Sequence, residues 1–229
     1  MFTAACTIPV DIPPFRLSGV VYGALLNQRG ALDEIAALAG NPPYGALPRA
    51  PVLQIKPRNT LAGPGAVVQI PPGVTDLEIG ANLGLVIGRP ACRVGADEAL
   101  DFVAGYLIVN DIGIAHDSFH RPAIRLKARD GFCPLGPAVV ARSAIPDPDA
   151  LRIRTYADGV LVQDWNTADL VRSTSRLLAD VTEFMTLAPG DILAVGAARP
   201  SPRARAGQRV EITIDVVGTL SSSFAAAPS

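Results

Sequence analysis

The sequence predicts a mostly β globular domain with a few short helices. Its 229 residues are 49% hydrophobic and 18% charged, so a sizeable core can form and disorder is not expected. Short apolar runs bounded by Gly and Pro recur along the chain, and such runs are typical of strands. Asp158-Gly159 gives a strong hairpin signal, because this pair readily adopts the positive φ angles of a tight turn. No internal repeat or low-complexity linker is present, which favours one domain.

The first half of the chain is expected to alternate strands with turns. Residues 31–40 predict a short helix that ends at Gly40. The strand that begins at residue 51 breaks at Pro57, since proline has no N–H for a sheet hydrogen bond. The expected strands occupy residues 20–26, 51–61 as far as Pro57, 65–72 and 83–88.

The second half adds helices and a long loop. Residues 97–113 are interpreted as a helix that enters a buried strand, and 168–185 as a second helix. Residues 116–137 have no clean period and much Gly and Pro, so we interpret them as a long ordered loop that carries function. Strands are expected over residues 138–143, 151–165 (the hairpin), 191–196 and 210–220.

Composition bounds the class of protein. Residues 1–18 are interpreted as a Pro-rich leader without the features of a signal peptide, and 19–224 as the folded domain. No apolar run reaches the roughly 20 residues that a membrane span needs. Three distant cysteines and two histidines predict neither a disulfide framework nor a zinc site, and the unpaired thiols suit the cytoplasm. A net charge of −1 does not indicate a nucleic-acid or anionic-membrane surface.

Three cations follow or precede predicted strands. Lys56, Arg58 and Arg29 lie where strands end, and there they could hold a di- or tricarboxylate substrate through charge-assisted hydrogen bonds. The alternative is that they are solvated surface charges, and the sequence favours neither interpretation.

Asp111 is the most conspicuous polar residue. It follows the apolar stretch 105–109, so it is expected at the end of a buried strand, where a carboxylate needs a cation, a metal or a cap. Lys127 and Arg129 precede a tight Gly/Pro stretch further along, and Lys127 is the candidate cation for Asp111. A purely structural ion pair that closes the loop is the alternative.

Several short motifs occur in order along the chain. They are IKPRNT at 55–60, Asn-Asp at 110–111, SFHRPAI at 118–124, RDGFCP at 129–134, DWNTADL at 164–170, EFMTLAPGD at 183–191 and GTL at 218–220. Together they resemble the fumarylacetoacetate hydrolase family over about residues 20–222. Within that family, the chain is similar to the N-terminal half of the bifunctional isomerase/decarboxylases of 4-hydroxyphenylacetate breakdown.

The resemblance implies a mixed β-roll with peripheral helices and a metal-dependent chemistry. Active family members bind one Mg²⁺ or Mn²⁺ through two glutamates of an E-x-E strand and one later aspartate, and oxygen ligands suit these hard cations. The metal chelates a keto or enol acid and stabilises the negative charge formed on enolisation or loss of CO₂. By this resemblance Asp111 matches the aspartate ligand, and Lys127 matches a lysine that positions the substrate.

The two glutamate positions of the family fall on Gly80 and Asn82. The metal is therefore expected to be absent or weakly bound, because a site with one carboxylate in place of three loses most of its charge. Glu78 faces the same way as these positions in an extended strand and is a candidate replacement if the backbone bulges. The alternative is that Glu78 is a solvated residue at the strand's entry.

The resemblance also suggests a substrate pocket lined with positive charge. Asn166 and Thr167 match an Asn-Thr motif of the family. The residues predicted to bind the substrate are Lys56, Arg58, Arg121, Arg129, Asn166 and Thr167, with Lys127 as the catalytic candidate.

Three functional hypotheses follow. In the first, the chain is a metal-poor subunit of a 2-hydroxyhepta-2,4-diene-1,7-dioate isomerase/5-oxopent-3-ene-1,2,5-tricarboxylate decarboxylase, and it forms a homodimer or pairs with a metal-bearing homologue. In the second, it is an independently active tautomerase, decarboxylase or keto-acid hydrolase. In the third, it is a non-catalytic keto-acid-binding or scaffold protein, since a fold does not fix a function.

Overall fold

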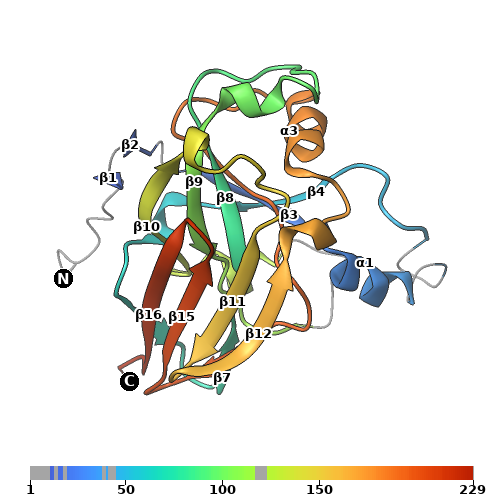
Figure 1. The fold of residues 1–229 in the computed structure, drawn as a ribbon. Coiled ribbons are helices and arrows are strands. Elements are labelled where there is room, and N and C mark those ends of the chain that lie inside the picture. The colour runs from blue at the N-terminus through green and yellow to red at the C-terminus, as the bar shows by residue number, and fades with distance from the viewer. Residues whose placement is uncertain are drawn as a thin grey trace.

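Two packed β-sheets dominate the structure, which confirms the mostly β prediction (Figure 1). The structure is a computed structural model that describes residues 11–12, 15–17, 20–37, 40, 45–116 and 123–228. Figure 1 shows β16, β15, β11 and β12 side by side, with α3 above the sheets and α1 at one side. Buried side chains of both sheets form one large core cluster.

The seven-stranded sheet curls because of how its edges are connected. Its order is β4 (Val52–Lys56), β3 (Val21–Leu25), β13 (Ile192–Ala194), β8 (Ala81–Ile87), β9 (Val103–Asn110), β10 (Cys133–Ala141) and β5 (Leu61–Ala62). The edge strands β4 and β5 are separated in the chain only by the 3₁₀ turn η1 (Arg58–Thr60). The two edges must therefore approach one another, which brings the end of β4 close to the end of β9.

The five-stranded sheet covers one face of the seven-stranded sheet. Its order is β12 (Val160–Asn166), β11 (Arg152–Ala157), β15 (Arg209–Ile214), β16 (Gly218–Ala226) and β6 (Ala66–Ile70). Every residue of β8 is buried, because β8 lies inside its sheet and both of its faces are covered. A strand buried on both faces needs the continuous apolar sequence that predicted it.

Short elements complete the fold. They are the pairs β1 (Asp11–Ile12) with β2 (Phe15–Arg16) and β7 (Asp76–Glu78) with β14 (Arg203–Arg205), the helices α1 (Arg29–Ala36), α2 (Ile124–Lys127) and α3 (Thr174–Thr182), and the 3₁₀ turns η2 (Ala99–Phe102), η3 (Arg142–Ala144) and η4 (Thr167–Asp169). The Gln28 side chain caps α1 and the Ser173 side chain caps α3. None of the helices in the described part of the chain is both long and apolar enough to traverse a bilayer.

Most predicted strands are confirmed, but some boundaries were wrong. Residues 133–137, expected in a loop, form the start of β10, and the preceding stretch contains the short helix α2. The helix expected before β9 is the single 3₁₀ turn η2. The loop prediction failed because pairing with β9 and β5 overrides the weak strand propensity of Gly and Pro there.

Two further predictions were wrong near the C-terminus. The helix expected over 168–185 begins only after Ser173, whose hydroxyl accepts a hydrogen bond from Arg176 N. The strand expected over 210–220 is instead the hairpin of β15 and β16, which turns at Val216 with a φ of 67°. A β-branched residue rarely adopts this conformation, so the sequence carried no signal for the turn.

The β11–β12 hairpin turns at Asp158-Gly159 as predicted, and Gly159 has a φ of 81°. We expect Gly159→Ala to lower the free energy of unfolding by roughly 1–2 kcal/mol, because a Cβ disfavours the left-handed region. Gly159→Asn should cost less, since Asn tolerates this region. Urea unfolding of the two variants tests this, and equal stability of Gly159→Ala and the parent chain would contradict it.

Candidate functional site

Asp111 lies at the end of β9, where the predicted site is centred. Residues 105–110 before it are all buried, and its backbone N–H donates to Gly80 O at 2.9 Å. Only 10% of its side chain is exposed. The carboxylate therefore needs compensating partners from the protein.

Three side chains hold this carboxylate. Lys56 Nζ lies 2.6 Å from Oδ1, and Lys127 Nζ lies 3.4 Å from Oδ2. Gln54 Nε2 also donates to Oδ2. Gln54 and Lys56 alternate with the exposed Ile55 on β4, so both point inward. The predicted Lys127 partner is thus present, but Lys56 is the nearer cation.

The pKa of Asp111 reports the balance of these effects. Burial by itself raises this pKa, because it disfavours the charged form. The two ammonium groups and the hydrogen bonds from Lys56 and Gln54 outweigh burial and hold the pKa of this carboxyl well below its usual range. Asp111 is therefore ionised throughout the neutral range.

Lys56 is occupied by the protein rather than open to a ligand. Only 2% of its side chain is exposed, and Nζ also donates to Ile112 O at 2.7 Å, Lys127 O at 3.0 Å and Phe132 O at 3.2 Å. An ammonium has three N–H donors, and all are used. The substrate-binding role predicted for Lys56 does not fit this arrangement, because the curl of the sheet turns the end of β4 inward.

Gly80 and Asn82, which the resemblance matches to the other two metal ligands, offer no carboxylate for a divalent metal. A Cβ added to Gly80 would lie 2.6 Å from Asp111 O, so the backbone has closed the space that a side chain needs. Asn82 is buried, and its Oδ1 accepts from Gly196 N at 3.0 Å. The described parts of the chain contain no group of three or more His, Cys, Asp or Glu residues suited to a metal ion.

Glu78, the candidate replacement ligand, is engaged by two arginines. Arg199 lies 3.4 Å and Arg203 3.6 Å from its carboxylate oxygens. Glu78 lies in β7, which pairs with β14, and its backbone is bonded to Gly113. The side chain is therefore part of a surface ion-pair network, in which Arg199 also contacts Glu34 of α1.

The remaining predicted substrate residues are scattered. Arg58 is exposed in η1, and Arg121 lies outside the described residues. Asn166 caps η4 by accepting from Ala168 N at 2.8 Å. Thr167 is buried, and its hydroxyl donates to Pro148 O at 2.9 Å and accepts from Leu151 N at 2.8 Å. The side chains of Asn166 and Thr167 thus hydrogen-bond to backbone groups of the protein rather than to a ligand.

We expect Thr167→Val to lower the free energy of unfolding by about 1–3 kcal/mol, because it leaves two buried backbone groups without a partner. Keto-acid binding by the folded variant should match that of the parent chain. Denaturant unfolding and a ligand titration separate these effects. Loss of binding without loss of stability would restore the predicted substrate role.

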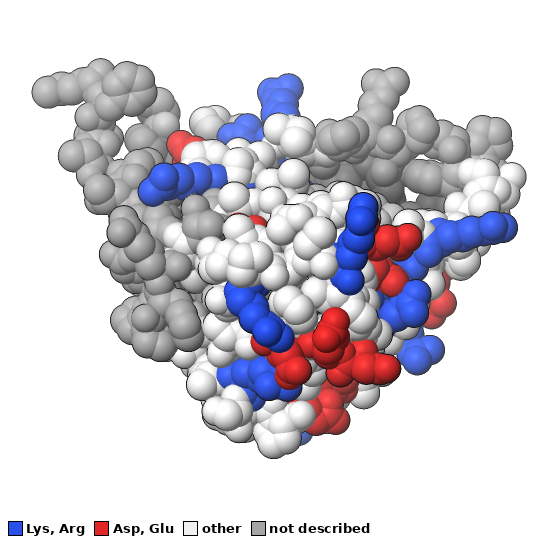
Figure 2. Space-filling model, turned by 90° about the horizontal axis from the view of Figure 1, so that it is seen from above, with Lys and Arg blue, Asp and Glu red and all other residues white. Residues whose placement is uncertain are grey.

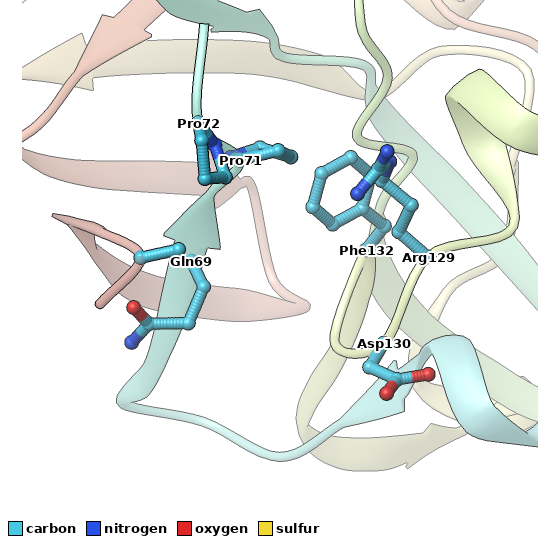
Figure 3. A pocket seen from close by; sticks show the side chains of 7 residues that line it. Gln69, Pro71, Pro72, Arg129, Asp130 and Phe132 are labelled. Carbon is cyan, nitrogen blue, oxygen red and sulfur yellow. The ribbon is translucent and has the colours of Figure 1, made fainter. Parts of the chain in front are cut away.

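An open pocket of about 340 Å³ shares Phe132 with the surroundings of Lys56. Its lining residues are Gln69, Pro71, Pro72, Arg129, Asp130, Phe132 and Ala227. Figure 3 shows Pro71 and Pro72 facing Phe132 and Arg129. Phe132 links the pocket to the site, because its carbonyl accepts from Lys56. Arg129, one of the predicted substrate residues, thus lines this pocket.

Charges on the face seen in Figure 2 are mixed. Blue basic and red acidic side chains lie next to one another, without an extended field of one sign. This agrees with the net charge of −1. The concentration of cations at Asp111 is therefore a local feature of the site.

Comparison with known proteins identifies the class. The family model "Fumarylacetoacetate (FAA) hydrolase C-terminal" matches residues 20–225. The chain is 38% identical over 196 residues to the 4-hydroxyphenylacetate degradation bifunctional isomerase/decarboxylase of Escherichia coli, over 86% of this chain and 44% of the relative. The chain thus spans less than half the length of that relative.

Solved structures with similar folds support the same family. The structure of 5-carboxymethyl-2-hydroxymuconate delta-isomerase from Mycobacterium smegmatis superposes with a TM-score of 0.79 at 29% identity, covering 93% of this chain and 81% of the other. Maleylpyruvate hydrolase from Sphingobium sp. SYK-6, solved with manganese(II) and pyruvate, gives 0.75 at 28% identity, covering 91% and 71%.

The two packed sheets with their short peripheral helices thus define a mostly β protein of the α+β class. The chain belongs to the fumarylacetoacetate hydrolase family. The family includes isomerase/decarboxylases and hydrolases, and at least one member binds manganese.

Sequence reasoning missed Gln54 and the central place of Lys56. The signal available was the alternation of β4, which points both residues to the same side. A second signal is composition. Lys56 and Lys127 are the two lysines of the entire sequence, which otherwise uses arginine, and both contact Asp111.

Proposed function

We propose that this chain is a subunit of a cytoplasmic isomerase/decarboxylase for an unsaturated keto or enol di- or tricarboxylate of aromatic catabolism, such as 4-hydroxyphenylacetate breakdown. Its own metal site is degraded, and it pairs with a metal-bearing homologue. The supporting observation is that Asp111, the one carboxylate at the family's ligand positions, is already neutralised by Lys56 and Lys127.

In this proposal the chain's residues bind and orient the substrate. Arg129 lines the accessible pocket and supplies a planar fork for a carboxylate. Lys127 is 22% exposed and lies beside Asp111, so its ammonium can meet the negative oxygen of an enol acid. The metal, where the partner supplies it, provides Lewis-acid stabilisation of the enolate.

The test is an assay of the purified chain with Mg²⁺ or Mn²⁺, alone and mixed with a family member that carries both strand glutamates. We expect no metal-dependent loss of CO₂ or isomerisation from the chain alone, and co-purification with higher kcat/KM in the mixture than in the partner alone. In the mixture, Arg129→Ala should raise KM. Arg142→Ala, which breaks an exposed pair with Asp101, is the matched control. An unchanged rate in the mixture would overturn the proposal.

Independent activity is the second candidate. The partly exposed Lys127 next to an ionised Asp111 supports it, since a tautomerisation needs only a positioned acid and base. Turnover by the isolated chain that Lys127→Met abolishes and Arg142→Ala leaves intact would establish it.

A keto-acid-binding protein without catalysis is the third candidate, and the pocket beside Arg129 supports it. Saturable binding of a dicarboxylate without turnover, both alone and with the partner, would favour this function over the other two.

A further inference from the structure

Four oxygen atoms surround the ammonium of Lys56. They are Asp111 Oδ1 at 2.6 Å, Ile112 O at 2.7 Å, Lys127 O at 3.0 Å and Phe132 O at 3.2 Å. We call these atoms the oxygen cage. One carboxylate and three backbone carbonyls make up a ligand set suited to a hard cation. The cation in this set arrives on a side chain from β4, at the far edge of the curled sheet.

The identity of that side chain is informative. The sequence has 18 arginines and two lysines, and the cage holds one of the lysines. A guanidinium is planar and directs its donors in a fork, whereas an ammonium is a compact charge with three donors arranged around it. Convergent oxygens on several sides of one nitrogen suit the ammonium. An arginine would not fit the cage.

The charges around Asp111 oppose the binding of a metal ion in addition to Lys56 and Lys127. Asp111 contributes one negative charge, and Lys56 and Lys127 contribute two positive charges within 3.4 Å of it. A divalent ion added there would face two ammonium groups with one carboxylate to share, at low exposure to water. The Lys56 ammonium and a divalent metal ion would therefore compete for the Asp111 carboxylate.

We propose that the oxygen cage is a cation site whose resident cation is the Lys56 ammonium, supplied covalently by the chain, and that removing it opens the cage to a small external cation such as ammonium or K⁺. The cage also ties Ile112, Lys127 and Phe132 to β4, because each of them gives one backbone carbonyl to Lys56. Arg129 lies between the last two of these residues, so Lys56 acts as a positioning residue for Lys127 and Arg129.

The experiment measures melting temperatures of Lys56→Ala in chloride salts of equal ionic strength. We expect Lys56→Ala to melt about 10 °C below the parent chain in tetramethylammonium chloride, which is too large for the cage. Ammonium should raise the melting temperature by about 4 °C for each tenfold rise in concentration above its Kd. The parent chain should respond equally to ammonium and tetramethylammonium.

Three matched variants sharpen the result. Lys56→Met fills the space without charge and should show no ammonium-specific gain. Lys56→Arg keeps the charge but should still be destabilised. Lys127→Ala, which removes a partly exposed ammonium outside the cage, should also show no specific gain. Identical melting of Lys56→Ala in all salts, or an equal ammonium gain in Lys56→Met, would overturn the proposal.

A measurement on the unmodified cage keeps the proposal testable if Lys56→Ala does not fold. In a Lys127→Arg chain labelled with ¹⁵N-lysine, Lys56 is the remaining lysine, so its side-chain NH₃⁺ signal needs no assignment. We expect a signal that persists at neutral pH, because its protons are bonded and buried. Rapid exchange with water would overturn the cage. Both readouts are independent of activity, so their failure is distinguishable from failure of the proposed function.

Discussion

Replacing Asp111 by Asn is expected to lower the free energy of unfolding at pH 7 by about 3–5 kcal/mol, because it leaves a buried ammonium without its counter-charge. The Lys56 side chain is 2% exposed and has no route to bulk water without breaking the cage. Urea unfolding gives the difference directly. Lys127→Met is the control: its ammonium is 22% exposed and 3.4 Å from the carboxylate, so solvent screening should keep its cost near 1 kcal/mol or below.

The stability difference between the parent chain and Asp111→Asn should depend on pH. The pKa of Asp111 is depressed in the folded chain, so its stabilising contribution is present above the unfolded value of about 3.9 and is lost as the pH falls below it. The stability difference between the parent chain and Asp111→Asn should thus narrow as the pH falls below about 4. A difference that does not narrow there would contradict an ionised, strongly paired Asp111.

The second large effect is expected at Gly80. Gly80→Ala should lower the free energy of unfolding by about 2–3 kcal/mol, since its Cβ would meet Asp111 O at 2.6 Å and push apart two hydrogen-bonded segments. Gly95→Ala is the matched control, because the nearest atom to its Cβ would be a flexible Glu98 carbon at 3.8 Å. Its stability should stay within about 0.5 kcal/mol of the parent chain.

The Gly80 effect carries a functional consequence. Restoring both carboxylates in Gly80→Glu/Asn82→Glu should not create a tight Mn²⁺ site, because the backbone has closed at Gly80 and Asn82 anchors Gly196 N. Calorimetric titration of the chelator-treated variant measures this. Stoichiometric Mn²⁺ binding that Asp111→Asn abolishes would show that the loss of the glutamates alone separates this chain from metal-binding relatives.

Short stretches of sequence predicted much of the fold. The apolar run of β8 and the Asp158-Gly159 pair predicted a strand and a turn that the structure contains, since both signals lie within a few neighbouring residues. The helix boundary at Ser173 and the turn at Val216 were not readable, because a cap and a strained turn are selected by the tertiary packing around them. The same holds for the site. The apolar run before Asp111 predicted its place at the end of a strand, but no local pattern predicted its pairing with Lys56.

The sequence by itself determined that Asp111 ends a buried strand and that its carboxylate needs a cation, a metal or a cap. These two conclusions follow from residue chemistry and hydrophobic pattern, whereas the expectation that Gly80 and Asn82 stand at two ligand positions follows from the family resemblance. Only the tertiary structure decided which cation pairs with Asp111, because Lys56 lies 55 positions earlier in the chain, on the edge strand β4, four strands from β9 in the order of the sheet. The closure of that edge through η1 carries the ammonium to the carboxylate, and no local pattern encodes such a long-range approach.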